Sequence, residues 1–294
     1  SFKIYIVCFY LKIMKKVAII GAAGFIAKRH VQAIKYLKHN LILACDKHEN
    51  VGYLDSFFPN CEFTTSEKKF FEKVKSKKVD YVVICTPNYL HYSHIIKGLN
   101  NGSSVICEKP LVLKKSDFKK LLNLKPKKRN KLNIILQLRL NKNLDKIKSF
   151  IKSQKKIKSL NLTYVTPRGN WYQSTWKSNC LKSGGVQTNI GIHLFDIACQ
   201  LFGDPLKLTK KISNSKTLLG KIVFKSSLEM NFKLSIKKED LPKGHSSYRV
   251  LEINRKNFDL SKSFTNLHVE SYKKIINGNG FKVESYKKVF ELFN

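Results

Sequence analysis

The first half of the chain alternates short apolar runs with longer segments in which apolar residues recur every three or four positions. The apolar runs lie at residues 16–21, 41–46, 80–87, 104–110 and 133–140. The helical period is clear at 25–39 and 90–102. Strands buried on both faces are apolar without alternation, and helices of this length between them are typical of βαβ units. The pattern predicts an α/β fold with a doubly wound parallel sheet over residues 14–140.

The second half of the chain has a different pattern. Stretches 160–166, 220–236 and 248–260 are strand-rich and have short connections, which is typical of antiparallel pairing. A helix is expected at 191–203, and further helices at the end of the chain. We therefore predict a C-terminal α/β domain at 141–294 with a mostly antiparallel open sheet.

The first thirteen residues are apolar but are interrupted by Lys3 and Lys12. This stretch is too short to span a bilayer and has no small-residue cleavage site. Because Met14 directly precedes the first predicted strand, we expect the domain to begin there and residues 1–13 to be an extension of unassigned status. We expect a cytoplasmic protein without a membrane partner.

Composition narrows the classes of protein that fit. The chain has 294 residues, 43% of them hydrophobic, and a formal charge of +36. The excess is almost entirely lysine spread through every segment, whereas base readout and bidentate phosphate binding favour arginine. Seven cysteines are scattered without a Cys-x-x-Cys pair, which argues against a zinc site and a disulfide framework. We expect no nucleic acid, no metal, and a positive field that attracts a small anionic substrate.

The first strand–helix junction carries the small residues of a dinucleotide-binding turn. In "VAIIGAAGFIAKRH", Gly21, Gly24 and Ala27 follow the strand and open the helix. Such a turn lets the backbone approach a pyrophosphate at a helix N-terminus, and a purely structural tight turn is the alternative. The second strand ends in Asp46, where a carboxylate would accept hydrogen bonds from the adenosine ribose and repel a 2′-phosphate. The pattern favours NAD over NADP, although Lys47 is adjacent and Asp46 could be a plain turn residue.

Two further strands end in polar turns at the same expected edge of the sheet. "VVICTPN" turns at Thr86, Pro87 and Asn88, and "VICEKPLV" places Glu108 and Lys109 at the end of a buried strand. In open parallel sheets, ligands bind at the carboxyl ends of the strands. We interpret Lys109 as a site residue, and the alternative is a surface turn with a solvated charge pair.

These turns resemble those of the Gfo/Idh/MocA family of oxidoreductases, whose members carry a "TPN…H" turn and an "EKP" motif. The resemblance covers nearly the whole chain from Met14. It implies an N-terminal Rossmann domain and a C-terminal domain whose open sheet supports the substrate site and a homo-oligomer, commonly a tetramer. It also implies that Lys109 reaches the nicotinamide and the reacting hydroxyl, that Glu108 helps to fix the cofactor, and that the Lys109–Pro110 bond can be cis. The NAD site implied by this resemblance consists of Gly21, Gly24, Phe25, Ile26, Asp46, Thr86, Pro87, Asn88, His91, Glu108, Lys109 and Gln137.

The segment "GGVQTNIGIHLFDIA" resembles the family's G-x-H-x-x-D stretch, whose histidine faces the substrate. His193 and Asp196 are three residues apart at the start of a predicted helix and can share a face. Many members have an aspartate four residues before this histidine, whereas this chain has Asn189, whose amide cannot take a proton. Proton transfer then depends on Lys109 or His193, and from the residues alone a structural histidine is the alternative.

Six motifs in one order resemble, within this family, the UDP-N-acetyl-2-amino-2-deoxyglucuronate dehydrogenases of bacterial surface-polysaccharide synthesis. They are "GAAGFIAKRH", "TPNYLHY", "VICEKPLV", "NIILQLR", "RGNWYQSTWK" and "TNIGIHLFD". This resemblance implies NAD-dependent oxidation of the C3 hydroxyl of UDP-N-acetylglucosaminuronic acid to a 3-keto sugar, in lipopolysaccharide or O-antigen synthesis. The alternatives are another sugar or inositol dehydrogenase of the family, or a non-catalytic NAD-binding protein.

The expected substrate-binding stretch is "TPRGNWYQSTWK". Arg168 offers a planar fork for a carboxylate or a diphosphate, and the aromatic residues of this stretch offer flat apolar area, with core or interface packing as the alternative for both tryptophans. The expected substrate residues are Lys109, Arg168, Asn170, Trp171, Tyr172, Asn189 and His193. His268 and Tyr272 lie one turn apart on a predicted helix and can approach the site.

Overall fold

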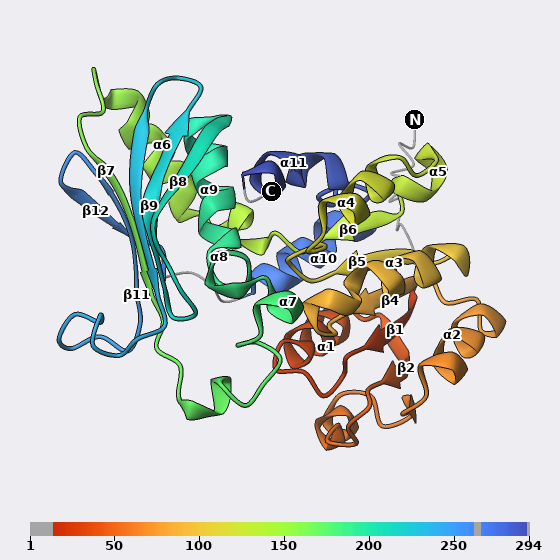
Figure 1. The fold of residues 1–294 in the computed structure, drawn as a ribbon. Coiled ribbons are helices and arrows are strands. Elements are labelled where there is room, and N and C mark those ends of the chain that lie inside the picture. Colours follow the sequence, from red (N-terminus) through yellow and green to blue (C-terminus); the bar gives the residue numbers. More distant parts are fainter. Residues whose placement is uncertain (1–13, 262–265, 293–294) are drawn as a thin grey trace, which may run out of the picture.

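The computed structural model describes residues 14–261 and 266–292, so the predicted extension at 1–13 lies outside the described residues. Two six-stranded sheets stand next to each other, and helices fill the space between them (Figure 1). The first sheet belongs to the N-terminal half of the chain and the second to the C-terminal half. The predicted α/β class is confirmed.

The first sheet is parallel throughout, with the strand order β3-β2-β1-β4-β5-β6. Its strands are β1 (Lys16–Ile20), β2 (Asn40–Cys45), β3 (Glu62–Thr64), β4 (Tyr81–Ile84), β5 (Ser104–Cys107) and β6 (Leu132–Ile134). The helices and 3₁₀ turns of this half are α1 (Ala27–Tyr36), η1 (Gly52–Ser56), α2 (Glu67–Ser76), η2 (Asn88–Leu90), α3 (His91–Asn100), α4 (Lys115–Leu122), α5 (Pro126–Arg129) and η3 (Gln137–Leu140). This strand order is that of the Rossmann fold, whose ligands lie where the order reverses, beside β1 and β4.

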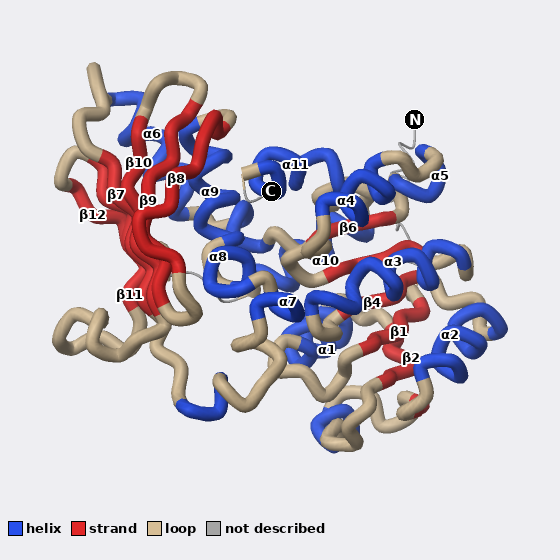
Figure 2. The backbone as a smooth tube through the Cα atoms, viewed as in Figure 1, coloured by secondary structure: helices blue, strands red, loops and turns tan. Residues whose placement is uncertain are grey.

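The second sheet has the order β12-β11-β7-β10-β9-β8 and is mostly antiparallel, because only β7 and β10 run parallel. Its strands are β7 (Leu160–Val165), β8 (Pro205–Ser213), β9 (Thr217–Phe224), β10 (Glu229–Ser235), β11 (Tyr248–Ile253) and β12 (Lys256–Asp259). The helices and the turn of this half are α6 (Asn143–Ser153), η4 (Asn170–Tyr172), α7 (Cys180–Ser183), α8 (Gly185–Asn189), α9 (Ile192–Phe202), α10 (Leu267–Ile276) and α11 (Val283–Glu291). Helices α8 and α9 lie on the side of this sheet that faces the Rossmann half (Figure 2).

The other face of the second sheet is polar. Leu160 and Leu162 are buried, so the residue between them points to the opposite face of the sheet. There the Asn161 side chain donates to Glu252 Oε1 at 2.8 Å and accepts from Asn231 Nδ2 at 3.2 Å. A row of hydrogen-bonded side chains therefore crosses the middle strands on this face.

The last predicted strand of the first sheet is shorter than expected. The apolar run 133–140 suggested one strand, but β6 ends at Ile134 and the chain turns into η3. The η3 turn carries a buried ion pair: Arg139 Nε donates to Asp196 Oδ2 at 2.8 Å, and Arg139 Nη2 reaches Asp196 Oδ1 at 2.5 Å. The residues after β6 thus contact α9, a helix of the second half of the chain.

The last two helices return to the first half of the chain. Helix α10 packs against α1 and η3, and α11 packs against α4, β6 and α9. Tyr272 and Ile275 of α10 belong to the same apolar cluster as Val17 and Ile19 of β1. The C-terminal end of the chain is therefore part of the core around the Rossmann sheet.

Two sequence-level observations can be compared directly with the structure. The cysteines of the described ranges are all free, and Cys45 and Cys107 of the first sheet and Cys85, directly after β4, are buried. Burial raises the pKa of Cys45 to about 12, so its thiol stays protonated and packs as a small apolar group. Within residues 14–261 and 266–292, no helix is both long and apolar enough to cross a membrane.

The Arg139–Asp196 pair generates a stability prediction. We expect Asp196→Ala to lower the free energy of unfolding by about 3–5 kcal/mol, because it leaves a guanidinium buried without its partner. Urea unfolding followed by circular dichroism measures this. Glu270→Ala, which breaks the exposed pair with Lys273, is the control and should change stability little. A loss below about 1 kcal/mol for Asp196→Ala would contradict the role given to the pair.

Candidate active site

A cavity of about 1090 Å³ opens at the carboxyl ends of the first sheet and extends to the loops of the second half. It is lined by every residue that the sequence predicts for the cofactor and the substrate, except Asn170 and Trp171. Trp171 is exposed and packs edge-on against Tyr172, which does line the cavity. Residues far apart in the sequence thus meet at one place.

The glycine turn approaches the neighbouring strand end closely. Gly21 has a φ of 90°, and a Cβ there would lie 2.5 Å from the backbone of Cys85 and Thr86. Only glycine fits this position, so the turn packs directly against the chain after β4. The start of α1, which follows the turn, can bind a phosphate group. The Asp46 carboxylate braces the turn by accepting from Ala23 N at 3.0 Å. These contacts fit a dinucleotide pyrophosphate beside α1 and a ribose beside Asp46.

The two polar strand ends are joined by His91. Its ring nitrogens lie 2.7 Å from the carbonyl oxygen of Pro110 and 2.9 Å from that of Thr86. The Lys109–Pro110 bond is cis, as expected. Asn88 Nδ2 donates to Ser183 O at 2.8 Å and so ties this edge to α7. The loops after β4 and β5 are therefore held in one arrangement beside the cavity.

Lys109 extends from the end of β5 towards the second half of the chain. Its Nζ donates to the backbone carbonyl of Asn189 at 2.9 Å. Burial lowers the pKa of Lys109, and the nearby charges of Arg168 and Lys177 lower it further, while Glu108 opposes this. The neutral amine, which can accept a proton, is therefore reached at lower pH than for an exposed lysine.

His193 stands at the start of α9, on the other side of the cavity from β5. The helix begins so close to the second sheet that Gly191 has no room for a side chain. A Cβ there would lie 2.5 Å from Leu234 Cδ1. Burial, and then the charge of Lys109, lowers the pKa of His193 well below its usual value. Its Nδ1 is buried and has no hydrogen-bond partner within the described chain. His193 is a neutral imidazole, and Asp196, which pairs with Arg139, does not orient it.

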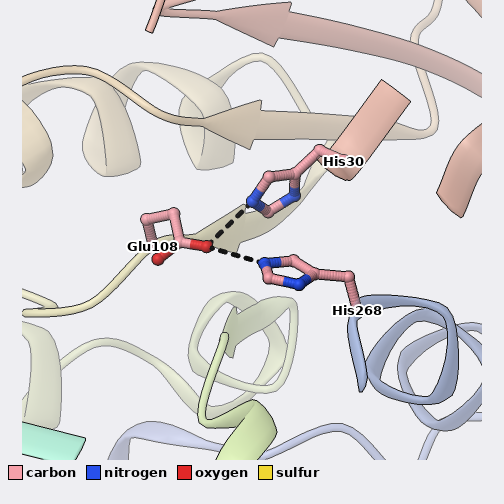
Figure 3. Close-up of side chains that lie close together, drawn as sticks. All are labelled: His30, Glu108 and His268. Carbon is pink, nitrogen blue, oxygen red and sulfur yellow. Dashed lines mark hydrogen bonds and ion pairs between the residues drawn. The ribbon is translucent and has the colours of Figure 1, made fainter. Parts of the chain in front are cut away.

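Glu108 does not extend into the cavity as an unpaired carboxylate. Its Oε1 lies 2.9 Å from His30 Nε2 and 3.3 Å from His268 Nε2, and its Oε2 accepts from Lys109 N at 3.2 Å. Figure 3 shows the two imidazoles converging on the same oxygen atom from α1 and α10. His30 Nδ1 lies 2.8 Å from the Tyr272 hydroxyl. The expected cofactor contact of Glu108 remains a prediction, but protein donors occupy both its oxygens.

The cavity wall that comes from the second half of the chain carries several positive charges. Arg168, Lys177 and Lys182 belong to this wall, and Lys109 lines the cavity from the first half. No carboxylate of the described residues forms an ion pair with these side chains. Lys177 Nζ lies 5.3 Å from the centre of the Trp171 ring, and its pKa is lowered by burial and by Arg168. Such a group of cations without acidic partners is suited to a ligand with more than one negative charge.

Sequence reasoning missed several residues of the cavity wall. Lys177 is adjacent to Trp176, which also lines the cavity, and both lie in the stretch already singled out around Arg168. His94 and Glu67 also line the cavity, and His94 Nδ1 lies 2.9 Å from Thr86 Oγ1. The signal for Lys177 was its place in that motif, but a lysine among so many lysines has no pattern of its own.

Together, the parallel sheet, the glycine turn and the acidic end of β2 define a dinucleotide-binding oxidoreductase fold. Residues 15–135 match the oxidoreductase family's NAD-binding Rossmann fold, and residues 148–222 match its C-terminal alpha/beta domain. The chain belongs to the Gfo/Idh/MocA family of oxidoreductases, and the predicted cofactor, NAD, is confirmed at the level of this family.

Among solved structures, the chain is similar to the WlbA (WbpB) dehydrogenase of Thermus thermophilus in complex with NAD and UDP-GlcNAcA. The two are 34% identical, with a TM-score of 0.89 over 95% of this chain and 94% of that chain. Among curated proteins, the glucose-6-phosphate 3-dehydrogenase of Bacillus subtilis is 27% identical over 64% of this chain and 54% of that protein. The D-glucoside 3-dehydrogenase of Escherichia coli is 27% identical over 65% of this chain and 54% of that protein. The chain spans about half the length of the curated relatives it matches.

Asp46 generates a prediction about cofactor preference. We expect the unaltered protein to bind NAD more tightly than NADP. Asp46→Ala should weaken NAD binding about tenfold or more, because the ribose loses a charged acceptor, and should reduce the difference in affinity between NAD and NADP. Asp46→Asn is the control, since an amide can still accept from Ala23 N but does not repel a 2′-phosphate. Calorimetry with both dinucleotides measures this, and a preference of the unaltered protein for NADP would contradict it.

Proposed function

We propose that the protein is a dehydrogenase that oxidises the C3 hydroxyl of UDP-N-acetylglucosaminuronic acid with NAD and forms a 3-keto sugar. The observation that carries this is the cluster of Arg168, Lys177 and Lys182 in the same cavity as Lys109 and the dinucleotide turn. A nucleotide uronate has both a diphosphate and a carboxylate, which such a cluster can bind. The similarity to the Thermus thermophilus dehydrogenase in complex with NAD and UDP-GlcNAcA supports the same substrate class.

Lys109 is the proposed general base. Bound NAD would supply the hydride acceptor, with its ribose at Asp46 and its pyrophosphate at the Gly21 turn. Lys109 Nζ, held by the Asn189 carbonyl, would take the proton of the sugar hydroxyl. Because the pKa of Lys109 is lowered, the rate of oxidation should rise with pH through that lowered pKa, as the amine loses its proton.

His193 is the proposed hydrogen-bonding partner of the reacting hydroxyl. Its pKa lies well below the usual value, so it stays neutral across the working range of pH and does not add a second titration there. A neutral imidazole can donate from one nitrogen and accept at the other, and can relay a proton to Lys109. Asn189 cannot take that proton, but its amide donates to the Tyr172 hydroxyl at 3.3 Å and so shapes the substrate side of the cavity.

A second candidate is a dehydrogenase for a smaller sugar or an inositol. Several curated relatives act on such compounds, for example glucose-6-phosphate, a D-glucoside or scyllo-inositol. A smaller substrate would leave Lys177 and Lys182 without anionic partners in the cavity. The number of cations therefore favours the nucleotide sugar.

The assay that tests the function follows the absorbance of NADH when the protein is mixed with NAD and a panel of UDP-sugars. UDP-N-acetylglucosaminuronic acid should give the highest turnover, and UDP-N-acetylglucosamine, which lacks the carboxylate, is the matched control. A parallel arm contains a 2-oxo acid, because a related dehydrogenase forms a complex with NAD and alpha-ketoglutarate. In this arm bound NADH would reduce the 2-oxo acid to a 2-hydroxy acid and return to NAD, so NADH does not accumulate, and turnover is followed by chromatography of the 3-keto sugar. Higher turnover with an inositol or a free sugar would overturn the proposal in favour of the second candidate.

We also propose a homotetramer in the cytoplasm that acts in the synthesis of a surface polysaccharide such as an O-antigen. The polar face of the second sheet, with Asn161, Asn231 and Glu252, has no helix over it among the described residues and is the proposed contact between copies (Figure 2). Light scattering at micromolar concentration should give the mass of a tetramer. A monomer under these conditions would be inconsistent with this arrangement.

Two substitutions test the proposed base and its partner. Lys109→Met should preserve the fold and most of the NAD affinity but lower the single-turnover rate by about a hundredfold to ten-thousandfold, because the base is lost. His193→Asn should give a comparable or smaller loss, and the two losses should not add if the residues act together. Lys114→Met, an exposed lysine at the start of α4, is the control. A rate for Lys109→Met within about threefold of the unaltered enzyme would rule out the proposed role.

A further inference from the structure

Glu108 is a buried carboxylate whose hydrogen-bond partners come from three separate segments. It is only 5% exposed, His30 is 0% exposed and His268 is 5% exposed. His30 belongs to α1, at the dinucleotide turn, and His268 belongs to α10, near the end of the chain. A buried charge is tolerated when it is paired and hydrogen-bonded, so this arrangement needs all three segments in place.

The protonation pattern of this cluster follows from its contacts. Burial raises the pKa of Tyr272 and lowers that of His30, so a protonated hydroxyl faces a neutral imidazole. The hydroxyl then donates to His30 Nδ1, and His30 Nε2 carries the proton and donates to Glu108. Although burial opposes ionisation, hydrogen bonds from His268 and His30 hold the pKa of Glu108 well below its usual range. Glu108 is therefore an anion next to the proposed base.

We infer that His268 is a positioning residue, which holds the Glu108 carboxylate in place and thereby sets both the position and the proton affinity of Lys109. This inference rests on the role proposed for Lys109. It adds that His268, on α10, controls how well Lys109 performs that role. Glu108 is tied to Lys109 N through Oε2 and to His268 through Oε1. A change at His268 therefore reaches the cavity through one carboxylate, without any contact of its own with the cofactor or the substrate.

The charges around Glu108 and Lys109 define the direction in which the pKa of Lys109 should change. Lys109 is influenced by Glu108 on its own turn and by the positive charges of Arg168 and Lys177, and it lies near His193 of α9. Glu108 also acts on His91 of α3, Cys85 after β4 and Cys107 of β5. Glu108 is the one source of negative charge among these groups that stabilises the ammonium form of Lys109. Displacement of the Glu108 carboxylate from its present position would therefore lower the pKa of Lys109 further.

The same three side chains could also hold a metal ion, because two imidazoles and a carboxylate present ligand atoms within 4.8 Å of one another. The hydrogen-bond arrangement is favoured by the contacts of Glu108. Both of its oxygens already accept from N–H groups, and the side chains are almost completely buried, which leaves little room for water to complete a metal's ligands. Metal binding is therefore treated as an outcome of the test.

The test uses His268→Leu, which removes the N–H donor, and His268→Gln, whose amide can place an N–H near the former Nε2. Ser271→Ala, one turn along α10 and bonded only to the Leu267 carbonyl, is the matched control. The single-turnover rate should fall about tenfold to a hundredfold in His268→Leu, because misplacement of a reacting group has costs of that order. The rate should recover in His268→Gln and stay unchanged in Ser271→Ala.

The pH profile separates positioning from a general loss of structure. In His268→Leu, the acidic limb of the rate profile should move to lower pH, because a Glu108 carboxylate that is no longer held in place stabilises the Lys109 ammonium less. Equal losses in the Leu and Gln variants, or unchanged rates and limbs in both, would overturn the inference. Tyr272→Phe, which removes only the donor to His30, should shift the limb in the same direction and serves if His268→Leu does not fold.

A measurement without substrate keeps this test independent of the proposed function. Competitive labelling with acetic anhydride, followed by peptide mass spectrometry, gives the pKa of Lys109 in the free protein. It should be lower in His268→Leu than in the unaltered protein, even if no UDP-sugar yields NADH and the proposed function fails. Elemental analysis after addition of zinc completes the experiment. One tightly bound ion per chain that is lost in His268→Leu would show that the three side chains form a metal site, and would overturn the inference.

Discussion

The arrangement of the cavity at the carboxyl ends of the first sheet depends on how one buried charge is paired. An ionised carboxylate away from water costs several kcal/mol unless donors surround it, and Glu108 at the end of β5 is surrounded by His30, His268 and the backbone of Lys109. Those donors come from the helix that follows the dinucleotide turn, from the turn that carries Lys109, the proposed base, and from a helix of the second half. The contacts that stabilise the buried carboxylate therefore join the dinucleotide turn to the proposed catalytic residue.

A second buried charge has a similar effect on the opposite wall. Arg139 leaves the first sheet to pair with Asp196 on α9, the helix that carries His193. The bidentate pair fixes how α9 sits against η3, where Gln137 lines the cavity. Lys109 and His193, which come from different halves of the chain, thus line one cavity, and the halves are joined by the hydrogen bonds of Glu108 and by the Arg139–Asp196 ion pair.

Much of this organisation could be predicted from the sequence, and the reasons are specific. Gly21, Asp46 and Lys109 follow apolar runs, and strand ends in a parallel sheet meet at one edge, so their proximity follows from topology. The end of β6 at Ile134 could not be predicted, because an apolar run looks the same whether it continues as a strand or turns into buried 3₁₀ structure, and the partner of Arg139 lies 57 residues away. The contacts of His30 and His268 with Glu108 were equally hidden, since residues 30, 108 and 268 share no local pattern. The place of Lys177 in the cavity wall could not be recognised, because lysines are abundant in every segment of the sequence.

The return of α10 to the first half has a consequence for the order of events during synthesis. A ribosome completes the Rossmann strands and the Glu108 turn long before it makes His268, and α10 can dock only after residues 266–276 have left the exit tunnel. Until then, Glu108 lacks one of its donors, and the apolar surface that Tyr272 and Ile275 cover in the folded protein is exposed. The nascent chain should therefore reach a stable dinucleotide-binding half only after α10 and α11 have been made and have closed the core.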